Sequence, residues 1–234
     1  RGNACGDFAA AGSSETAPSR VTSAERLTAG LQAIAFTFPD SIQARLLAYL
    51  GLLSKWNRTY NLTAIRDPDA MITQHLIDSL AILPIFDQLV LAARRQFRLA
   101  DVGSGAGLPG IPLAIACPQW SVSLIETVEK KSAFQRQVKL ELNLTNLFVI
   151  NARVEQQPPA GFDAVISRAF ADLGDFVNLA GHLVPDDGRL FAMKGGFPDQ
   201  EIAALPQTWT VESANEIKVP GLDARRHLIV LRKT

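Results

Sequence analysis

The sequence predicts an α/β fold: a doubly wound, mostly parallel sheet with an antiparallel terminal strand, preceded by a helical segment. From Phe97 onward, short strand-like runs alternate with helix-like runs, which is the pattern of parallel strands joined by crossover helices. A glycine-rich turn over 103–110 follows the first strand-like run directly. Further along the chain, two strand-like runs have no helix between them, which indicates a hairpin.

The part before Phe97 has helical periodicity. Apolar residues recur at three- and four-residue spacing between Leu46 and Trp56 and give one apolar face. Asp67-Pro68 is typical of an N-cap followed by proline at the first helical position. The helix that it opens should end near Pro84 and carries Met71, His75, Asp78 and Ile82. We therefore expect a helical segment over 24–96, after a disordered lead-in over 1–23 that does not resemble a signal peptide.

The second part, 97–234, should form one domain. Strands are expected over 97–102, 121–125, 147–150, 162–167 and 188–194, with helices over 111–116, 130–142 and about 173–183. The last two strand-like runs, 209–219 and 227–232, are joined by the turn-prone Pro220-Gly-Leu-Asp223. One of these two strands should therefore run antiparallel to the rest of the sheet.

The composition limits the classes of partner. Lys plus Arg and Asp plus Glu both number 23, so the chain has no global positive field that gathers nucleic acid. A local basic face is nevertheless enough for a selective contact with RNA. The 2 cysteines lie far apart and the 3 histidines are scattered, which predicts no disulfide framework and no metal site and favours a reducing, cytoplasmic location. No apolar run approaches the length that a bilayer requires, so no membrane partner is expected.

The glycine-rich turn indicates a nucleotide-like ligand. Gly103, Gly105 and Gly107 lie directly after a strand and before a helix, the context in which such a turn carries a binding site. Only glycine allows both a sharp turn and close approach of a ligand, and a plain turn needs fewer glycines. A dinucleotide fingerprint has its third glycine three positions after the second, where this chain has Leu108. The G-x-G-x-G spacing after the acidic Asp101 is typical of methyltransferases that bind S-adenosylmethionine.

A carboxylate at the end of the second strand supports a ligand that contains adenosine. Glu126 lies 23 residues after Gly103, where it can accept hydrogen bonds from both ribose hydroxyls. Because this holds for S-adenosylmethionine and for a dinucleotide alike, Glu126 does not choose between them. The terminal hairpin does, since it is the usual end of a class I S-adenosylmethionine-dependent methyltransferase sheet and not of a Rossmann dinucleotide fold.

The residues after the fourth strand bear on the methyl acceptor. Enzymes that methylate exocyclic amines of adenine or cytosine usually carry Asn/Asp-Pro-Pro-Tyr/Phe there, whereas this chain has Ser167-Arg-Ala-Phe170. No cysteine follows the fourth or fifth strand, which disfavours C5-pyrimidine methylation through a thiolate. Guanine N7 fits an enzyme without an evident base, because its in-plane lone pair carries no proton and alignment with exclusion of water supplies the catalysis. Such an enzyme must read the Watson–Crick edge of a splayed-out base.

Several sequence blocks then identify a family. In order they are Lys55-Trp-Asn57, Tyr60-Asn-Leu-Thr-Ala-Ile65, His75-Leu-Ile-Asp-Ser-Leu80, Asp101-Val-Gly-Ser-Gly-Ala-Gly-Leu-Pro-Gly-Ile-Pro112, Arg153-Val-Glu155, Ile166-Ser-Arg-Ala-Phe170 and Met193-Lys-Gly195. From about Leu46 onward, the chain closely resembles the bacterial small-subunit rRNA (guanine-N7)-methyltransferase family, RsmG or GidB. The residues before that point fit the family poorly.

The resemblance implies a cytoplasmic enzyme that methylates guanine 527 of 16S rRNA, with S-adenosylmethionine as cofactor. Its partner is then 16S rRNA, the small ribosomal subunit or a precursor of it, and no metal is implied. By this similarity Gly103 and Leu108 line the methionine and adenosine path. Val154 and Glu155 flank the adenine, and Arg168 closes the site. Candidates for contact with the acceptor are Asn57, Asn61, His75, Asp78 and Lys194.

Each of these residues also has a structural interpretation. Arg168 suits an ion pair with a carboxylate such as Asp172 at a helix start, and Glu155 suits a helix cap or a surface position. His75 and Asp78, one turn apart, are equally suited to a hydrogen bond that links the helical segment to the sheet. The remaining three candidates suit a helix end, a turn and a solvated loop: Asn57, Asn61 and Lys194.

The basic side chains that suit RNA contact fall in three groups: Arg94, Arg95 and Arg98; Lys130, Lys131, Arg136 and Lys139; and Arg225 and Arg226. A helix face rich in Lys and Arg is usually a solvated surface, so these contacts stay open. Two other functions also stay open. One is methylation of a protein or small molecule on the same fold, and the other is a dinucleotide-binding oxidoreductase or a non-catalytic nucleotide-binding module.

Overall fold

One sheet and the helices around it make up the part of the chain that the computed structural model describes, residues 21–93, 95–168, 170 and 172–234. The strands are β1 Arg98–Val102, β2 Ser121–Glu126, β3 Leu147–Asn151, β4 Ala164–Ser167, β5 Arg189–Lys194, β6 Trp209–Glu216 and β7 His227–Lys233. The α-helices are α1 Ser23–Ala33, α2 Asp40–Tyr60, α3 Pro68–Met71, α4 Asp78–Leu80, α5 Asp87–Ala92, α6 Gly110–Ala116, α7 Glu129–Glu141, α8 Leu173–Ala180 and α9 Asp199–Ala203. A π-helical turn, η1 Ile72–Ile77, and the 3-10 turns η2 Leu83–Phe86, η3 Val154–Gln156 and η4 Gly181–Leu183 complete them.

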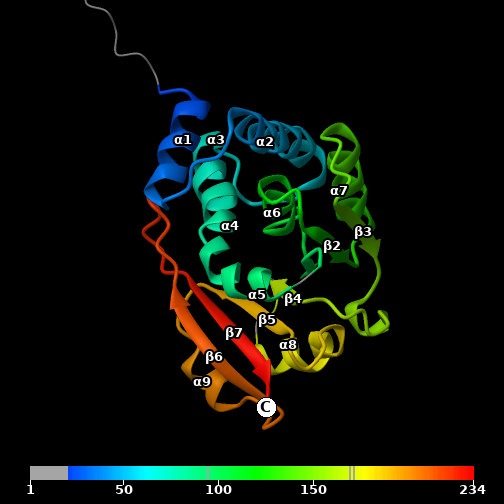
Figure 1. Cartoon of the computed structure of the whole chain (residues 1–234). Helices are drawn as coiled ribbons and strands as arrows, with labels where there is room; N and C mark the ends of the chain where they lie inside the picture. Colours follow the sequence, from blue (N-terminus) through cyan, green and yellow to red (C-terminus); the bar gives the residue numbers. More distant parts are fainter. Residues whose placement is uncertain (1–20, 94, 169, 171) are drawn as a thin grey trace, which may run out of the picture.

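The sheet has the strand order β3-β2-β1-β4-β5-β7-β6 (Figure 1). Strands β1 to β5 pair in parallel, and β7 pairs antiparallel with both β5 and β6. The predicted doubly wound sheet with an antiparallel terminal strand is therefore confirmed. The strand order reverses between β1 and β4, and open α/β sheets bind ligands at the carboxyl ends of the strands beside such a reversal.

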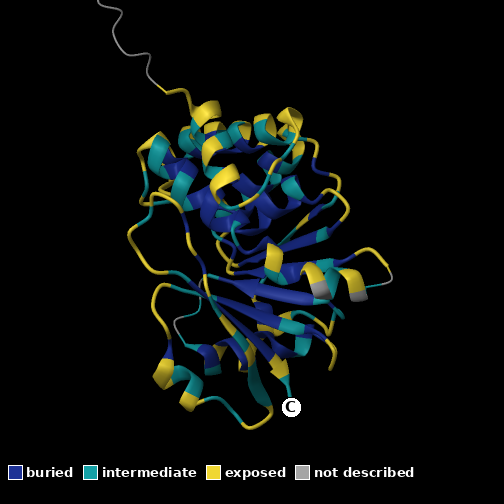
Figure 2. Ribbon diagram, turned by 60° about the vertical axis from the view of Figure 1, so that its left-hand side comes forward, coloured by how far each residue is buried: buried dark blue, intermediate teal, exposed yellow. Residues whose placement is uncertain are grey.

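Alternate residues of each strand face the two helical layers, because side chains along a strand alternate between its faces. Leu99 of β1 packs into a core shared by the helical segment, α6 and α7, whereas Ala100 and Val102 pack with α8. The first core includes Leu46 and Leu53 of α2 together with sheet residues. The helical segment and the sheet thus share one continuous core, and Figure 2 shows buried residues in both.

Local caps explain where two of the N-terminal helices begin. A capping box opens α1, in which the Thr22 hydroxyl accepts from the Glu25 amide at 3.2 Å and the Glu25 carboxylate accepts from the Thr22 amide at 2.8 Å. The Asp67 carboxylate accepts from the Ala70 amide at 2.7 Å, and Pro68 takes the first helical position of α3. The Asp67-Pro68 pattern therefore starts a helix as predicted.

That helix differs from the prediction in its middle. Residues Ile72–Ile77 form a π-helical turn, which contains His75, before α-helical geometry resumes at Asp78. π-helical turns are rare and frequently occur at functional sites. The sequence also gave no prediction for α9, a five-residue helix without a buried residue, because a helix so short and exposed leaves no apolar periodicity.

No helix within the described ranges is long and apolar enough to cross a membrane. Residues 1–20 of the expected lead-in, and the RNA-contact candidate Arg94, lie outside the described residues. At the start of the described chain, helix α1 already begins at Ser23.

Candidate cofactor and acceptor site

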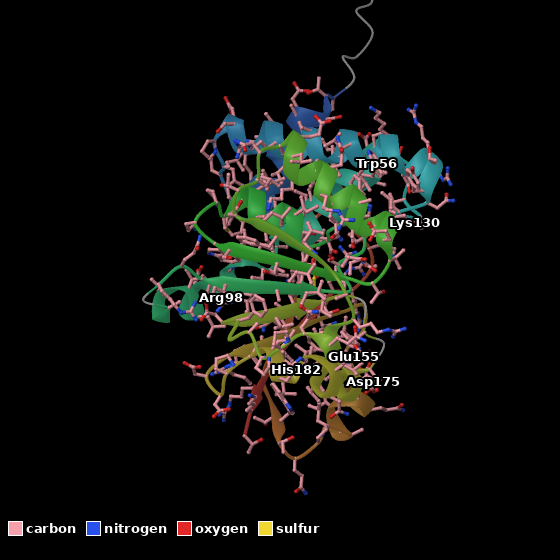
Figure 3. The ribbon with its side chains drawn as sticks, turned by 90° about the vertical axis from the view of Figure 1, so that its right-hand side faces the viewer. Trp56, Arg98, Lys130, Glu155, Asp175 and His182 are labelled. Atoms are coloured by element: carbon pink, nitrogen blue, oxygen red, sulfur yellow. The ribbon has the colours of Figure 1, made fainter. Side chains whose placement is uncertain are left out.

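A cavity of about 220 Å³ opens where the carboxyl ends of the first four strands converge. Its walls come from the residues after β1, β2 and β3, from the loop that follows β4, and from α8: Val102, Gly103, Ile125, Thr127, Ala152, Arg153, Val154, Glu155, Phe170 and Leu179. Three of the predicted cofactor residues line it, Gly103, Val154 and Glu155. Figure 3 shows Glu155 and Lys130 at this edge of the sheet and Arg98 at the opposite edge.

The glycine turn has a backbone that needs glycine. Gly103, Gly105 and Gly107 have φ values of 66°, 59° and 86°, the left-handed region that other residues rarely adopt. A Cβ atom on Gly107 would lie 2.2 Å from Cδ1 of Ile111. On Gly105, by contrast, a Cβ would meet only the carbonyl oxygen of Gly103, at 3.9 Å. The space above Gly105 is therefore open to a ligand.

Glu126 is built into this turn. Its Oε2 accepts a hydrogen bond from the Gly105 amide at 2.8 Å, and its Oε1 accepts from the Val128 amide at 2.9 Å. The side chain is buried, and the neighbouring residues Ile125 and Thr127 line the cavity. A carboxylate has about four lone-pair sites. Glu126 can thus hold the turn and still accept hydrogen bonds from a ligand.

Two further buried side chains hold the turn from other elements. The Tyr49 hydroxyl of α2 donates to the Ala106 carbonyl at 3.0 Å. The Gln135 amide of α7 donates to the Ser104 hydroxyl at 2.9 Å and to the Gly105 carbonyl at 2.8 Å. Burial raises the pKa of Tyr49, so its hydroxyl keeps the proton that it donates. The shape of the turn therefore depends on the helical segment as well as on the sheet domain.

We expect Tyr49→Phe to weaken the affinity for S-adenosylhomocysteine by about 3- to 10-fold, since a neutral hydrogen bond contributes about 0.5–1.5 kcal/mol and the Ala106 carbonyl loses its donor. Isothermal titration calorimetry measures this affinity. Thr28→Val is the matched control, because it removes a hydroxyl-to-Gln43 hydrogen bond of 2.8 Å within the helical segment, away from the turn. Equal affinities for Tyr49→Phe and the wild type would contradict the prediction.

Asp101 supports the turn from beneath. It is fully buried, and its Oδ2 accepts from the Gly110 amide at 2.8 Å. Burial raises the pKa of this carboxyl to about 7, against the opposing effects of the Gly110 hydrogen bond and the Arg168 charge. A Cβ on Gly110 would lie 2.8 Å from the same oxygen, so this glycine permits the contact.

Arg168, predicted to close the site, lies directly after β4 and pairs with Asp78 at 3.4 Å. Asp78 also accepts a hydrogen bond from Arg226 Nε at 3.2 Å. The alternative partner Asp172 instead caps α8, where its carboxylate accepts from the Asp175 amide at 3.1 Å. The expected link between the helical segment and the sheet therefore exists, as ion pairs made by Asp78.

Of the other acceptor candidates, two belong to one polar network. Asn57 accepts from the Thr63 amide at 2.9 Å, and the Thr63 hydroxyl lies 3.0 Å from Nε2 of His75. Burial, followed by the Arg168 charge, lowers the pKa of His75 to about 4, so its ring is neutral at pH 7. Asn61 caps α2 in the left-handed conformation, with φ 49°, and accepts from Arg66 at 3.2 Å.

Lys194 is held in place on the other side of the site. Its ammonium donates to Glu201 of α9 at 2.6 Å and to the Phe170 carbonyl at 3.2 Å. The same Glu201 oxygen accepts from the Leu173 amide at 2.9 Å. Lys194 therefore holds the backbone of Phe170, a residue of the cavity wall, and is not a solvated loop lysine.

The basic side chains predicted for RNA contact separate into two sets. Lys130 and Lys131 open α7 directly after β2, at the cavity edge of the sheet, and Arg225 is exposed beside Arg226. Arg95 and Arg98 lie at the start of β1 at the opposite edge, where Arg95 pairs with Asp163 at 2.8 Å. Lys139, near the far end of α7, lies over the Phe148 ring.

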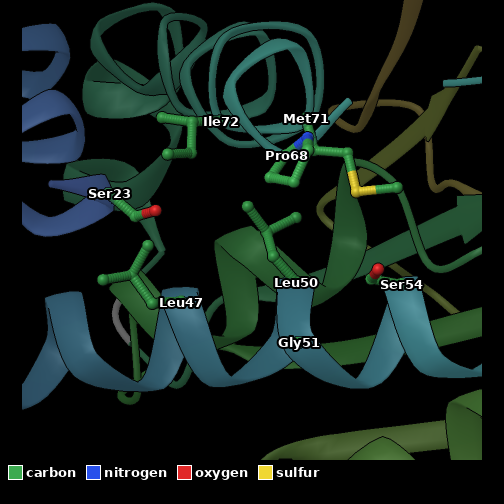
Figure 4. Close-up of a pocket in the computed structure, with 8 residues that line it drawn as sticks. All are labelled: Ser23, Leu47, Leu50, Gly51, Ser54, Pro68, Met71 and Ile72. Carbon is green, nitrogen blue, oxygen red and sulfur yellow. The ribbon is translucent and has the colours of Figure 1, made fainter. Parts of the chain in front are cut away.

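A larger cavity, of about 390 Å³, lies within the helical segment (Figure 4). Leu47, Leu50, Gly51 and Ser54 of α2 form one wall, and Pro68, Met71 and Ile72 lie opposite. None of the predicted site residues lines it. Because three of the predicted cofactor residues line the smaller cavity at the strand ends, the smaller cavity is the candidate site.

The residues at the smaller cavity fit an adenosine-containing sulfonium cofactor. The turn leaves open space above Gly105. The cavity has apolar walls from Val154 and Phe170, and carboxylate oxygens are offered by the buried Glu126. Three of the predicted cofactor residues do not line this cavity: Leu108, Glu126 and Arg168. Among the described residues, no group of three or more His, Cys, Asp or Glu side chains is arranged to hold a metal ion.

Sequence reasoning missed Tyr49, Gln135 and Phe170. A signal existed for the first two, since each is a polar side chain on the apolar face of a helix, where a buried hydroxyl or amide needs a partner. The sequence pattern does not show which residues are the hydrogen-bond partners of Tyr49 and Gln135. Phe170 belongs to the Ser167-Arg-Ala-Phe170 block, but no function was predicted for this residue from the sequence.

Comparisons with a family model and with known protein sequences point to one family. The family model of rRNA small subunit methyltransferase G matches residues 42–229. A ribosomal RNA small subunit methyltransferase G of Azoarcus sp. (strain BH72) is 54% identical over 211 residues, which cover 90% of this chain and 96% of that protein. The protein of the same description from Nitrosospira multiformis is 50% identical over 218 residues, covering 90% and 97% of the two chains.

Among solved structures, TrmN from Thermus thermophilus superposes with a TM-score of 0.56 at 21% sequence identity. The match covers 76% of this chain and 53% of the TrmN chain, so this chain spans about half the length of that protein. At this identity the likeness concerns the fold.

Proposed function

Because the chain belongs to the rRNA small subunit methyltransferase G family, we propose that it transfers a methyl group from S-adenosylmethionine to N7 of a guanine in 16S rRNA, guanine 527. One observation carries the cofactor assignment: the G-x-G-x-G turn forms part of a cavity at the strand ends, with the Glu126 carboxylate bound to the turn. The acceptor assignment rests on family membership and on the chemistry of the residues after β4.

The cofactor, when bound, supplies an electrophilic methyl group on a sulfonium centre. The chain's own contribution is then to bind the cofactor and to orient its methyl group toward the acceptor. Glu126 accepts hydrogen bonds from ribose hydroxyls while it holds Gly105, and Val154 with Phe170 covers the adenine and excludes water. The proposed cofactor set is completed by Glu155, which is exposed at the cavity, by Leu108, which is buried within the turn, and by Arg168 after β4.

No general base is required for the acceptor that we propose. Guanine N7 is unprotonated, so approximation and alignment supply the catalysis. Three acceptor candidates contact residues 61–66: Asn57, Asn61 and His75. The fourth, Lys194, contacts the Phe170 carbonyl. We propose that these contacts shape the space in which a splayed-out base would lie. The neutral ring of His75 suits contact with a base and does not add positive charge.

Lys130 and Lys131 are proposed as RNA contacts beside the cavity. We expect the double variant Lys130→Glu, Lys131→Glu to reduce rRNA methylation by about 10-fold or more at moderate salt, because phosphate contacts dominate affinity for RNA. Affinity for S-adenosylhomocysteine should stay unchanged. Initial rates of methyl transfer to small-subunit rRNA, measured at several salt concentrations, test this.

Lys139→Glu is the matched control for that experiment. It makes the same kind of charge reversal, at one position instead of two, on the same helix but near its other end and away from the cavity. Undiminished methylation by the double variant, or an equal loss in Lys139→Glu, would rule out the assignment.

The function itself is tested in two steps. Thermal unfolding with S-adenosylhomocysteine and with NAD separates a methyltransferase from a dinucleotide-binding protein, since a ligand stabilises the state that it binds. Mass spectrometry of 16S rRNA from a strain that lacks the protein, before and after it is added back, then identifies the methylated base. Absence of a methylated guanine that depends on the protein would overturn the proposal.

A further inference from the structure

Three segments that are distant in the sequence meet at the Asp78 carboxylate. Asp78 belongs to α4, just after the π-helical turn; Arg168 follows β4; and Arg226 precedes β7. Arg168 Nη1 lies 3.4 Å from Asp78 Oδ2, and Arg226 Nε donates to Oδ1 at 3.2 Å. The Asp78 side chain is only 1% exposed. This carboxylate therefore joins the helical segment, the loop after β4 and the terminal hairpin.

The two arginines are not equivalent. Arg226 makes a hydrogen bond to Asp78, whereas the contact of Arg168 with Asp78 is an ion pair without a hydrogen bond. Arg168 Nη1 is buried and has no hydrogen-bond partner among the described residues. Buried polar groups are almost always satisfied, so an unsatisfied one calls for a specific explanation, such as a catalytic role or a bound water or ion. The Nη1 group of Arg168 can thus donate a hydrogen bond to a ligand.

Arg168 is also coupled to the glycine turn. Burial raises the pKa of Asp101, just before the turn, and of Tyr49, which holds the turn, and the Arg168 charge opposes both rises. The residue before it, Ser167, donates to the Val102 carbonyl at 2.7 Å and so ties the end of β4 to the end of β1. Arg168 therefore follows a strand end that is tied to Val102, a residue of the cavity wall.

We propose that Asp78 is a positioning residue for Arg168, and that Arg226 fixes Asp78 in the orientation which this requires. The inference rests on the proposed function, because Arg168 is taken to donate to the bound cofactor. Asp78 itself does not contact the acceptor: its carboxylate is buried between two guanidinium groups, and a base would have to displace one of them. Arg226 belongs in this assembly and not among the RNA contacts.

A double-mutant cycle separates this role from a merely structural one. Arg168→Gln is expected to weaken affinity for S-adenosylhomocysteine by about 10-fold, and Asp78→Asn by a similar factor, which is typical for coupled residues. The variant that carries both changes should bind no more weakly than Arg168→Gln alone, because Asp78 acts through Arg168. Calorimetry gives the affinities, and thermal unfolding shows that each variant is folded.

Arg226→Gln supports the cycle where Asp78→Asn does not fold, since loss of a buried partner destabilises strongly. It should weaken affinity for S-adenosylhomocysteine by about 3- to 10-fold, and Arg226→Lys, which keeps the charge, should restore part of the loss. Arg189→Gln is the matched control: Arg189 of β5 pairs with Glu212 of β6 at the end of these strands opposite to Arg226, away from the cavity. This control should bind as the wild type does.

Each outcome has one meaning. Wild-type affinity in Arg226→Gln, or an Asp78→Asn effect that adds in full to that of Arg168→Gln, overturns the positioning role. A wild-type protein that does not bind S-adenosylhomocysteine overturns the proposed function instead, before any variant is compared.

Discussion

Glu126→Ala is expected to reduce affinity for S-adenosylhomocysteine by about 100-fold or more. The change removes hydrogen bonds to the Gly105 and Val128 amides and, in the proposed complex, those to the ribose. Hydrogen bonds to a charged group contribute about 1.5–3 kcal/mol each, so the loss of two such contacts is enough for this effect. Calorimetric titration and thermal unfolding with and without ligand measure it.

The neighbouring Glu129 provides the control for Glu126. Glu129 carries the same charge three residues later, but it is exposed at the start of α7 and pairs only with Arg136 among the described residues. Glu129→Ala should therefore bind S-adenosylhomocysteine normally. Glu126→Gln, which keeps one acceptor oxygen, should lie between the wild type and alanine. Full affinity in Glu126→Ala would mean that the cofactor binds elsewhere.

Gly107→Ala is the second substitution with a large expected effect. The residue has a φ of 86°, and the added Cβ would lie 2.2 Å from Cδ1 and 2.6 Å from Cγ1 of Ile111. The left-handed conformation and the overpacking together cost about 2–5 kcal/mol. A chain of this size then loses about 4–20 °C in its melting temperature, and cofactor affinity falls with the displaced turn. Differential scanning calorimetry tests the first effect.

Two companion variants make the test specific. Gly51→Ala, in the middle of α2, adds a Cβ that meets nothing within 4 Å, so it should stabilise the protein by about 0.5–1 kcal/mol. Ile111→Val removes the Cδ1 atom nearest to the new Cβ and should restore part of the loss when combined with Gly107→Ala. A melting temperature unchanged by Gly107→Ala would show that the turn does not have this geometry.

The elements that the sequence predicts well are those that local patterns specify. Alternating strands and helices gave the sheet, and the glycine turn with Glu126 gave the place of the cavity. The terminal hairpin gave the antiparallel strand. In each case the signal lies within a few neighbouring residues, or in the order of such signals along the chain.

The rest of the site depends on contacts between residues far apart in the sequence. The Tyr49–Ala106 hydrogen bond spans 57 residues, the Gln135–Ser104 bond 31, and the Arg226–Asp78 bond 148. Single-sequence patterns do not specify such pairs. For this reason Arg168 was given Asp172 as a possible carboxylate partner, whereas the fold brings Asp78 to it. The π-helical turn before Asp78 likewise has no sequence signature that we used.

The position of β7 has a consequence for synthesis on the ribosome. β7 follows β6 in the chain but lies between β5 and β6 in the sheet. Because a chain emerges from the ribosome N-terminus first, β6 emerges before β7, the strand that must be inserted beside β5. Until β7 emerges, β6 has no strand to pair with in this sheet. Arg226, just ahead of β7, reaches Asp78 at the same late moment. A nascent chain therefore cannot complete the proposed site until β7 has left the exit tunnel.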